Sequence, residues 1–242
     1  MPAHDGAMLR RPRAILFDWD NTLVDSWATI HEALNFLMRA MGVAEWTLDE
    51  TRGRVRLSLR EAFPIYFGER WEEARDIYLE RFRTIHLERL TPLPGRRELL
   101  QALVDDGIFL GVVSNKTGEL LRREVARLGW SELFGSVVGA GDAPLDKPAC
   151  EPVHLALLPS GVPAGEEVWF VGDTAVDMEC AVNSGCVGVL LAATAAGEFG
   201  GEFAEEFARE FARFAPQLSF ADEASLFRVL QGLRSELPPP IS

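Results

Sequence analysis

The sequence predicts an α/β protein in which helices flank a parallel sheet and a helical segment is inserted after the first strand. Three observations support this class. Short apolar runs without polar alternation are typical of strands buried on both faces of a parallel sheet. Segments with helical periodicity separate these runs, and such alternation gives parallel strands joined by right-handed crossovers. Residues 25–90 break the alternation, because they carry helical patterns and no convincing strand.

Strands and helices are expected to alternate along most of the chain. The expected strands are Ala14–Phe17, Ile108–Val113, Ser136–Val138, Val168–Val171 and Val187–Leu191. The expected helices are Arg96–Asp106, Thr117–Leu128, Ala149–Leu158 and Ala175–Ser184. Residues 1–24 and 91–242 would thus form one core domain, and residues 25–90 a second, helical domain.

The inserted segment carries its own helix signals. Apolar residues recur at helical spacing in two stretches, 27–41 and 71–85. Two tetrapeptides match the capping box that begins many helices: Thr47-x-x-Glu50 and Ser58-x-x-Glu61. The segment Thr91–Gly95, with two prolines and a glycine, then marks the return to the sheet.

Phenylalanine recurs every four residues near the C-terminus, at Phe199, Phe203, Phe207 and Phe211. A period of four exceeds the helical repeat, so the stripe moves by about 40° per repeat around a helix. We favour a core-facing amphipathic helix over a partner-binding face.

Composition and charge restrict the classes of function. The chain has 242 residues and a formal net charge of −13, whereas nucleic acids and anionic membranes bind basic faces. Its three cysteines are odd in number and form no Cys-x-x-Cys pair, which argues against a disulfide framework or a zinc site. No apolar run approaches the roughly 18 residues of a membrane span, and no apolar signal region opens the chain. We therefore expect a cytoplasmic monomer or homodimer without nucleic-acid or membrane partners.

Polar side chains follow three of the expected strands at the points where these strands end. Asp18 and Asp20 come after the first strand, Ser114-Asn115-Lys116 after the second, and Asp173 after the strand 168–171. Sites in open α/β sheets form at the carboxyl ends of the strands, so we expect these residues to meet. Each has a simpler interpretation, because Asp-x-Asp is often a solvated turn and Ser114 could be only a helix N-cap. Their shared position at strand ends favours a common site.

The residue types in this cluster indicate a chemistry. Carboxylate oxygens suit a hard cation such as Mg²⁺. Ser114 and the backbone N–H groups after it suit a phosphate held at a helix N-terminus. Lys147, in a loop before another helix, would supply a positive charge for the same anion, and Asp177 lies one helical turn beyond Asp173.

In this order and spacing, the motifs resemble those of the haloacid dehalogenase (HAD) superfamily in its phosphatase form. They are Phe17-Asp18-Trp19-Asp20-Asn21-Thr22-Leu23, Ser114-Asn115-Lys116, Lys147-Pro148 and Gly172-Asp173-x-x-x-Asp177. The resemblance runs from Ala14 to Leu191 and is greatest to the phosphoglycolate phosphatase group. It implies a Rossmann-like core, with residues 25–90 as a helical cap of the C1 type. Asn21 departs from the pattern, since glycine is commoner there.

The resemblance also implies roles in catalysis. Asp18 would be the nucleophile that forms an aspartyl-phosphate, and Asp20 the general acid and then the general base. The Asp18 carboxylate, the Asp20 backbone carbonyl and the Asp173 carboxylate would hold Mg²⁺, with Asp177 acting behind them or through water.

Phosphate binding is implied for four further positions. Ser114, the Asn115 N–H and Lys147 would bind the transferring phosphoryl group, and Thr22 would orient the first loop beside it.

A basic cluster at residues 51–60 resembles by position the specificity loop of such a cap. Our hypothesis is that Arg54 or Arg56 contacts a second anionic group of the substrate, such as a carboxylate or another phosphate. The other interpretation is a solvated helix start.

The expected function is a Mg²⁺-dependent phosphatase that acts on a small, phosphoglycolate-like phosphate monoester. Haloacid dehalogenases lack the second aspartate, so Asp20 argues against that activity. A phosphosugar mutase keeps both aspartates and differs only in its product. A non-catalytic phosphate-binding or scaffold protein is the third alternative, and the complete catalytic set argues against it.

Overall fold

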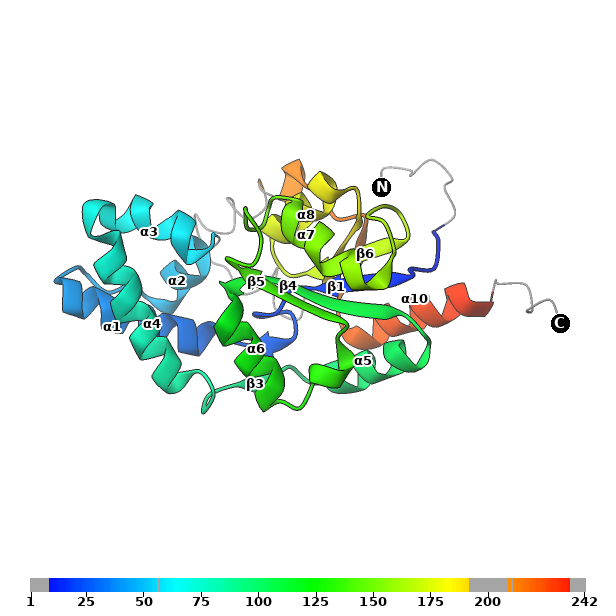
Figure 1. The fold of residues 1–242 in the computed structure, drawn as a ribbon, viewed down its shortest axis with the longest axis horizontal. Helices are drawn as coiled ribbons and strands as arrows, with labels where there is room; N and C mark the ends of the chain where they lie inside the picture. Colours follow the sequence, from blue (N-terminus) through cyan, green and yellow to red (C-terminus); the bar gives the residue numbers. More distant parts are fainter. Residues whose placement is uncertain (1–8, 56, 192–208, 210, 236–242) are drawn as a thin grey trace.

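A six-stranded parallel sheet in the order β5-β4-β1-β6-β7-β8 forms the centre of the computed structural model (Figure 1). The structure describes residues 9–55, 57–191, 209 and 211–235. The strands are β1 (Ala14–Phe17), β4 (Phe109–Thr117), β5 (Ser136–Ala140), β6 (Val168–Gly172), β7 (Val187–Leu191) and β8 (Leu218–Phe220). The predicted α/β class and its five predicted strands are confirmed, while β8 was missed because its three residues include a serine and form no apolar run.

Helices cover both faces of the sheet, which explains why the central strands are apolar throughout. On one face lie α5 (Arg96–Asp105), α6 (Gly118–Arg127) and α10 (Glu223–Ser235). On the other lie α7 (Glu151–Leu157) and α8 (Ala175–Ser184). Every residue of β1 and β6 is buried. Short 3₁₀ turns complete the connections: η2 (Ser131–Leu133) and η3 (Leu158–Ser160).

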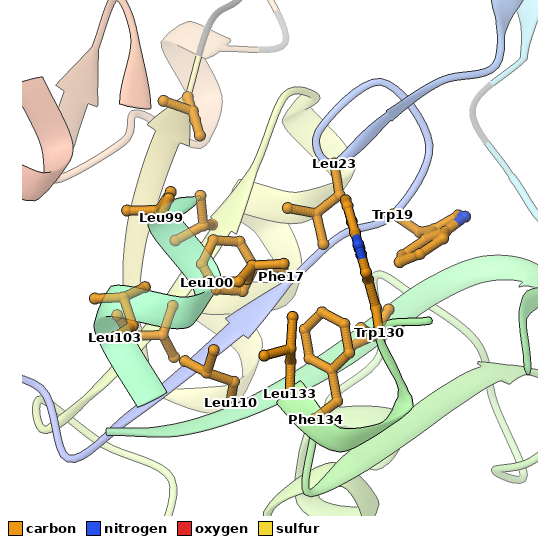
Figure 2. Packing of buried hydrophobic residues seen from close by; sticks show 14 of the residues in the cluster. Phe17, Trp19, Leu23, Leu99, Leu100, Leu103, Leu110, Trp130, Leu133 and Phe134 are labelled. Atoms are coloured by element: carbon orange, nitrogen blue, oxygen red, sulfur yellow. The ribbon is translucent and has the colours of Figure 1, made fainter. Parts of the chain in front are cut away.

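The larger core cluster lies between β1, β4 and the helices α5, α6 and α10 (Figure 2). Its large side chains each contribute about 1.5–3 kcal/mol by burial. Trp19, from the loop after β1, packs edge-on against Trp130 with the ring centroids 5.8 Å apart. The loop that carries the two aspartates is therefore anchored to the core by the residue between them.

The inserted segment forms a helical layer of its own at one end of the molecule (Figure 1). It consists of α1 (Trp27–Met41), α2 (Leu48–Arg54), α3 (Leu59–Phe67), η1 (Gly68–Arg70) and α4 (Trp71–Ile85). These helices share a separate hydrophobic cluster that includes Leu37, Phe63 and Phe82. Its two ends lie side by side, because β2 (Val24–Asp25) pairs antiparallel with β3 (Thr91–Pro92).

One of the two predicted capping boxes forms. The Thr47 hydroxyl accepts a hydrogen bond from the Glu50 N–H (3.1 Å), and the Glu50 carboxylate accepts one from the Thr47 N–H (2.8 Å). The capping box predicted at Ser58 is wrong, because the Ser58 hydroxyl donates to the Glu61 carboxylate (3.1 Å) and does not cap the backbone.

Two further expectations concern the ends of the chain. Phe199, Phe203 and Phe207 lie outside the described residues, so the predicted phenylalanine stripe stays a prediction. Among the helices of the described ranges, none has the length and apolar character to cross a membrane.

Candidate active site

Three neighbouring strands end at one edge of the sheet, where the predicted polar residues lie. β1 lies between β4 and β6 and runs parallel to both, so their carboxyl ends meet. Ligand sites of open α/β sheets form at such an edge, where the strand order reverses. The predicted residues that line one cavity there are Asp18, Asp20, Ser114, Asn115, Lys147 and Asp173.

The loop after β1 presents its two aspartates on the same side. Asp18 and Asp20 line the cavity, whereas Trp19 between them is fully buried in the core. Asn21 then adopts a left-handed conformation with φ 61°, which asparagine tolerates better than most residues. Its Oδ1 accepts a hydrogen bond from the Ser26 N–H (3.1 Å). Asparagine thus meets the same backbone requirement as the glycine that is commoner in the resembling motif.

Thr22 supports this loop from behind and does not line the cavity. It is fully buried, and its hydroxyl donates to Asp173 Oδ1 (3.2 Å). Its carbonyl accepts from the buried guanidinium of Arg96 (2.8 Å), which also pairs with Glu223 on α10 (2.8 Å). The expected loop-orienting role fits this geometry, and a direct contact between Thr22 and phosphate does not.

Ser114 lies at the cavity within β4 and not at the start of a helix. β4 continues to Thr117, which pairs with Ala140 of β5 after an irregularity in the register, and α6 begins at Gly118. The Ser114 hydroxyl accepts a hydrogen bond from the Lys116 N–H (3.2 Å). The expectation that Ser114 lies at a helix N-terminus is therefore wrong, because sheet pairing extends the strand past it. The helix expected from Thr117 begins one residue later, at Gly118.

Lys147 is a buried cation between two carboxylates. Its Nζ lies 2.6 Å from Asp18 Oδ1 and 2.7 Å from Asp177 Oδ1. The Asn115 side chain fixes the lysine backbone, because its Nδ2 donates to the Lys147 carbonyl and its Oδ1 accepts from the Lys147 N–H, both at 3.0 Å. Burial alone lowers a lysine pKa, but the two aspartates outweigh it and raise the pKa of Lys147, so the residue stays charged.

Three buried carboxylates gather beside this lysine. Ligand oxygens of Asp18, Asp173 and Asp177 lie within 4.8 Å of one another. Burial raises the pKa of Asp18 to about 7, with Lys147 opposing the rise and Asp177 adding to it. Burial, Asp177 and Asp18 likewise raise the pKa of Asp173 well above its usual value. One lysine leaves an excess of negative charge that a divalent cation would offset.

The donor set suits a hard metal ion. Carboxylate oxygens are the preferred ligands of Mg²⁺ and Ca²⁺. Both oxygens of Asp177 are already used, one by Lys147 and the other by the N–H and hydroxyl of Thr174 at the start of α8. Asp18 and Asp173 are therefore the better candidates for direct ligands, and Asp177 suits the supporting position expected for it.

A second buried lysine, Lys116, belongs to the second motif, and the sequence reasoning assigned it no role. Lys116 Nζ lies 2.6 Å from Asp20 Oδ1 and 2.6 Å from Glu124 Oε2. The Glu124 carboxylate also accepts from Trp19 Nε1 and pairs with His86 Nδ1, each at 2.7 Å. Burial opposes ionisation of Glu124, but these partners outweigh it and hold its pKa below the usual range. The network ties Asp20 to α6 and to His86 at the end of α4.

Two signals in the sequence could have revealed this network. Lys116 and Lys147 are the chain's two lysines among 24 basic residues, so lysine is confined to the site. Glu124 falls on the apolar stripe of Leu120, Leu121 and Val125, where a charge indicates a buried partner.

The cap side of the cavity has a different character. The cavity holds about 830 Å³ of empty space, part of it open to solvent. The lining residues from the inserted segment are Trp27, Ile30, Val55, Leu57, Leu59, Tyr78, Leu79 and Phe82. Among the described residues, this wall is apolar or aromatic throughout.

The arginines of the basic cluster take separate positions. Arg54 does not line this cavity; its guanidinium pairs with Glu50 at 3.2 Å and lies over the Trp46 ring, 4.9 Å from the centroid. Arg56 lies outside the described residues. Arg60 reaches the core, where it makes two 2.6 Å contacts with the Asp146 carboxylate, next to Lys147.

Known proteins resemble this chain in sequence or in fold. The phosphoglycolate phosphatase of Aquifex aeolicus is 34% identical over 181 residues, which cover 72% of this chain and 81% of that protein. The phosphoglycolate phosphatase of Photorhabdus laumondii is 29% identical over 187 residues, covering 74% and 80%. A haloacid dehalogenase-like hydrolase from Streptococcus pneumoniae has the same fold, with a TM-score of 0.76 at 21% identity over 91% of this chain and 99% of that one.

A family model adds the decisive match. The model of the haloacid dehalogenase-like hydrolases matches residues 15–190, which include the strand-end residues and the inserted helices. Since this match spans well over half of the chain, the chain belongs to the haloacid dehalogenase-like hydrolase family.

Proposed function

We propose that this chain is a Mg²⁺-dependent phosphatase that hydrolyses a small phosphate monoester through an aspartyl-phosphate on Asp18. Family membership and similarity to proteins named phosphoglycolate phosphatase support a phosphoric monoester hydrolase. The observation that carries the proposal is the pair of aspartates on one cavity, with Lys147 2.6 Å from Asp18.

Two covalent steps follow from this arrangement. The Asp18 carboxylate attacks phosphorus, the ester P–O bond breaks, and Asp20 gives its proton to the leaving alkoxide oxygen. Asp20 then takes a proton from a water molecule that attacks the phosphoryl group, and the P–O bond to Asp18 breaks to release phosphate. General acid–base catalysis of this kind contributes typically about 10²–10⁴-fold.

The phosphoryl group would be held by charge and by hydrogen bonds. Lys147, the Ser114 hydroxyl and the Asn115 N–H supply positive charge and donors, which stabilise the charge on the transferring oxygens. Mg²⁺ bound by Asp18, Asp173 and the Asp20 carbonyl would neutralise further phosphate charge. Asp177 positions Lys147 for this task.

The two structural layers would divide the work. We assign residues 1–24 and 91–242 to the catalytic core and residues 25–90 to a cap that closes over the substrate. The net charge of −13 supports a small-molecule substrate over nucleic acid or a membrane surface. A cytoplasmic monomer or homodimer remains part of the proposal.

Phosphate release from an aryl phosphate tests the proposal. We expect Mg²⁺-dependent release that chelation abolishes and that Asp18→Asn removes. A product that retains its phosphate at another position would identify a mutase. Absence of turnover across a broad panel of phosphate esters would contradict the proposal and favour a phosphate-binding protein without catalytic activity.

A further inference from the structure

We propose that the alcohol part of the substrate is apolar, an alkyl or aryl group without a second anionic group. This inference rests on the proposed phosphatase function and names its substrate class. Such a substrate differs from phosphoglycolate, after which the similar phosphatases are named, because glycolate carries a carboxylate close to the phosphorus.

The apolar wall lies opposite the catalytic residues. The phosphoryl-binding residues come from the core, so the rest of the substrate must extend toward the cap. Ile30 and Tyr78 from α1 and α4 face that space together with Val55 and Leu59 around α2 and α3. Such a wall gains free energy by excluding water from apolar groups, and its described residues give an ionised group no partner.

The described cations at the cavity are already engaged. Lys147 lies between Asp18 and Asp177, and Lys116 lies between Asp20 and Glu124. A substrate carboxylate would therefore compete with carboxylates that hold these lysines at 2.6–2.7 Å. An ionised group that loses water without such a partner is strongly disfavoured.

A second, largely apolar cavity lies within the inserted segment, beside the first. It has about 410 Å³ of empty space and shares Ile30, Val55, Leu57, Leu59 and Tyr78 with the catalytic cavity. Its other lining residues include Trp46, Phe63 and Phe67, and one cation, Arg54, whose guanidinium is paired with Glu50 at 3.2 Å. A leaving group several carbons longer than glycolate would lie along these shared apolar side chains, so we expect longer apolar groups to react better.

A matched pair of esters tests the inference with the intact, Mg²⁺-loaded protein. Ethyl phosphate and phosphoglycolate differ only in that a methyl group of the first is a carboxylate in the second. The carboxylate makes the glycolate alkoxide a better leaving group than ethoxide. We expect kcat/KM to be at least about tenfold higher for ethyl phosphate. From ethyl to butyl and hexyl phosphate, kcat/KM should rise up to about fourfold per methylene, equivalent to about 0.8 kcal/mol.

Variants of the cap sharpen the test. Leu57→Arg places a cation on the wall at a partly exposed position and should shift the ratio toward phosphoglycolate. Val43→Arg, at an exposed cap residue that lines neither cavity, should leave the ratio unchanged. Arg56→Ala addresses the cap cation outside the described residues, and we expect the preference for ethyl phosphate to persist.

The outcomes separate this inference from the proposed function. A wild-type preference for phosphoglycolate that Arg56→Ala abolishes would overturn the apolar substrate class and leave the phosphatase intact. A preference for phosphoglycolate in both the wild type and Arg56→Ala would also overturn the apolar substrate class. Failure to hydrolyse any ester in the set would overturn the phosphatase function and this inference with it.

Discussion

The two walls of the catalytic cavity are built on opposite principles. On the core wall, Lys147 and Lys116 each lie 2.6–2.7 Å from two carboxylates, and these charged groups come from strand ends, loops and the helices α6 and α8. On the cap wall, the described residues are apolar or aromatic. Fixed charges stabilise one kind of charge distribution, whereas an apolar wall discriminates by shape and size. The core wall is suited to the reaction and the cap wall to selection of the substrate.

The largest expected effect comes from removing Asp18, the proposed nucleophile on the core wall. Asp18→Asn should lower kcat by at least about 10³-fold, because the amide cannot attack phosphorus. Steady-state hydrolysis of an aryl phosphate with Mg²⁺ measures this. Asp25→Asn, at an exposed residue of β2, is the matched control and should retain activity. Comparable losses in both variants would contradict the special role of Asp18.

Removal of Lys147, the proposed phosphoryl-binding cation, should have the second largest effect. Lys147→Met should lower kcat/KM by about 10²–10³-fold, because it removes a preorganised charge and leaves Asp18 and Asp177 facing each other. Lys116 contacts Asp20, so Lys116→Met should lower kcat by about tenfold while KM changes little. Equal effects on KM would show that the two lysines do not divide their roles.

Crowded carboxylates on the core wall also predict a pH dependence of stability. The folded pKa of Asp18 is about 7, above the model-peptide value of 3.8, so the folded state binds more protons between these values. Without metal, this group's stabilisation is present below about pH 4 and is lost as the pH rises toward 7. We expect the free energy of unfolding, measured with chelator, to fall from pH 5 to pH 8 in wild type. The fall should be smaller in Asp18→Asn. An identical fall in both proteins would contradict the assignment.

The smallest effect is expected where the two walls meet. Arg60→Ala removes the ion pair between the cap and Asp146 and should raise KM about two- to fivefold, because a partly exposed pair contributes at most about 1 kcal/mol. Arg70→Ala breaks an exposed pair within the cap and is the control. A KM unchanged in Arg60→Ala would show that this contact does not hold the cap over the site.

The sequence predicted the core wall well because its information is local. Apolar runs located the strands, and the polar residues after them met at one edge as the parallel topology requires. The expectation that Ser114 lies at a helix N-terminus was wrong because pairing between β4 and β5, a non-local interaction, extends the strand to Thr117. The contacts of Lys116 with Glu124 and of Arg96 with Glu223 join residues whose partners no periodicity reveals.

The cap wall was harder to predict for a physical reason. Charged residues are conspicuous in a sequence, so the cluster at 51–60 directed attention to Arg54. Ile30, Tyr78 and Phe82 recur at helical spacing and look like ordinary core residues. Their contact with the cavity depends on how the cap packs against the core, which the helical pattern does not encode.

We assign the reaction to the core wall through a covalent intermediate on Asp18, and one measurement tests this directly. Enzyme mixed with a phosphate ester, quenched in acid and digested should yield a peptide containing Asp18 with the added mass of one phosphoryl group. Hydroxylamine should remove the label, and Asp18→Asn should not acquire it. Turnover without phosphorylation of Asp18, or a label that maps to another residue, would contradict the account.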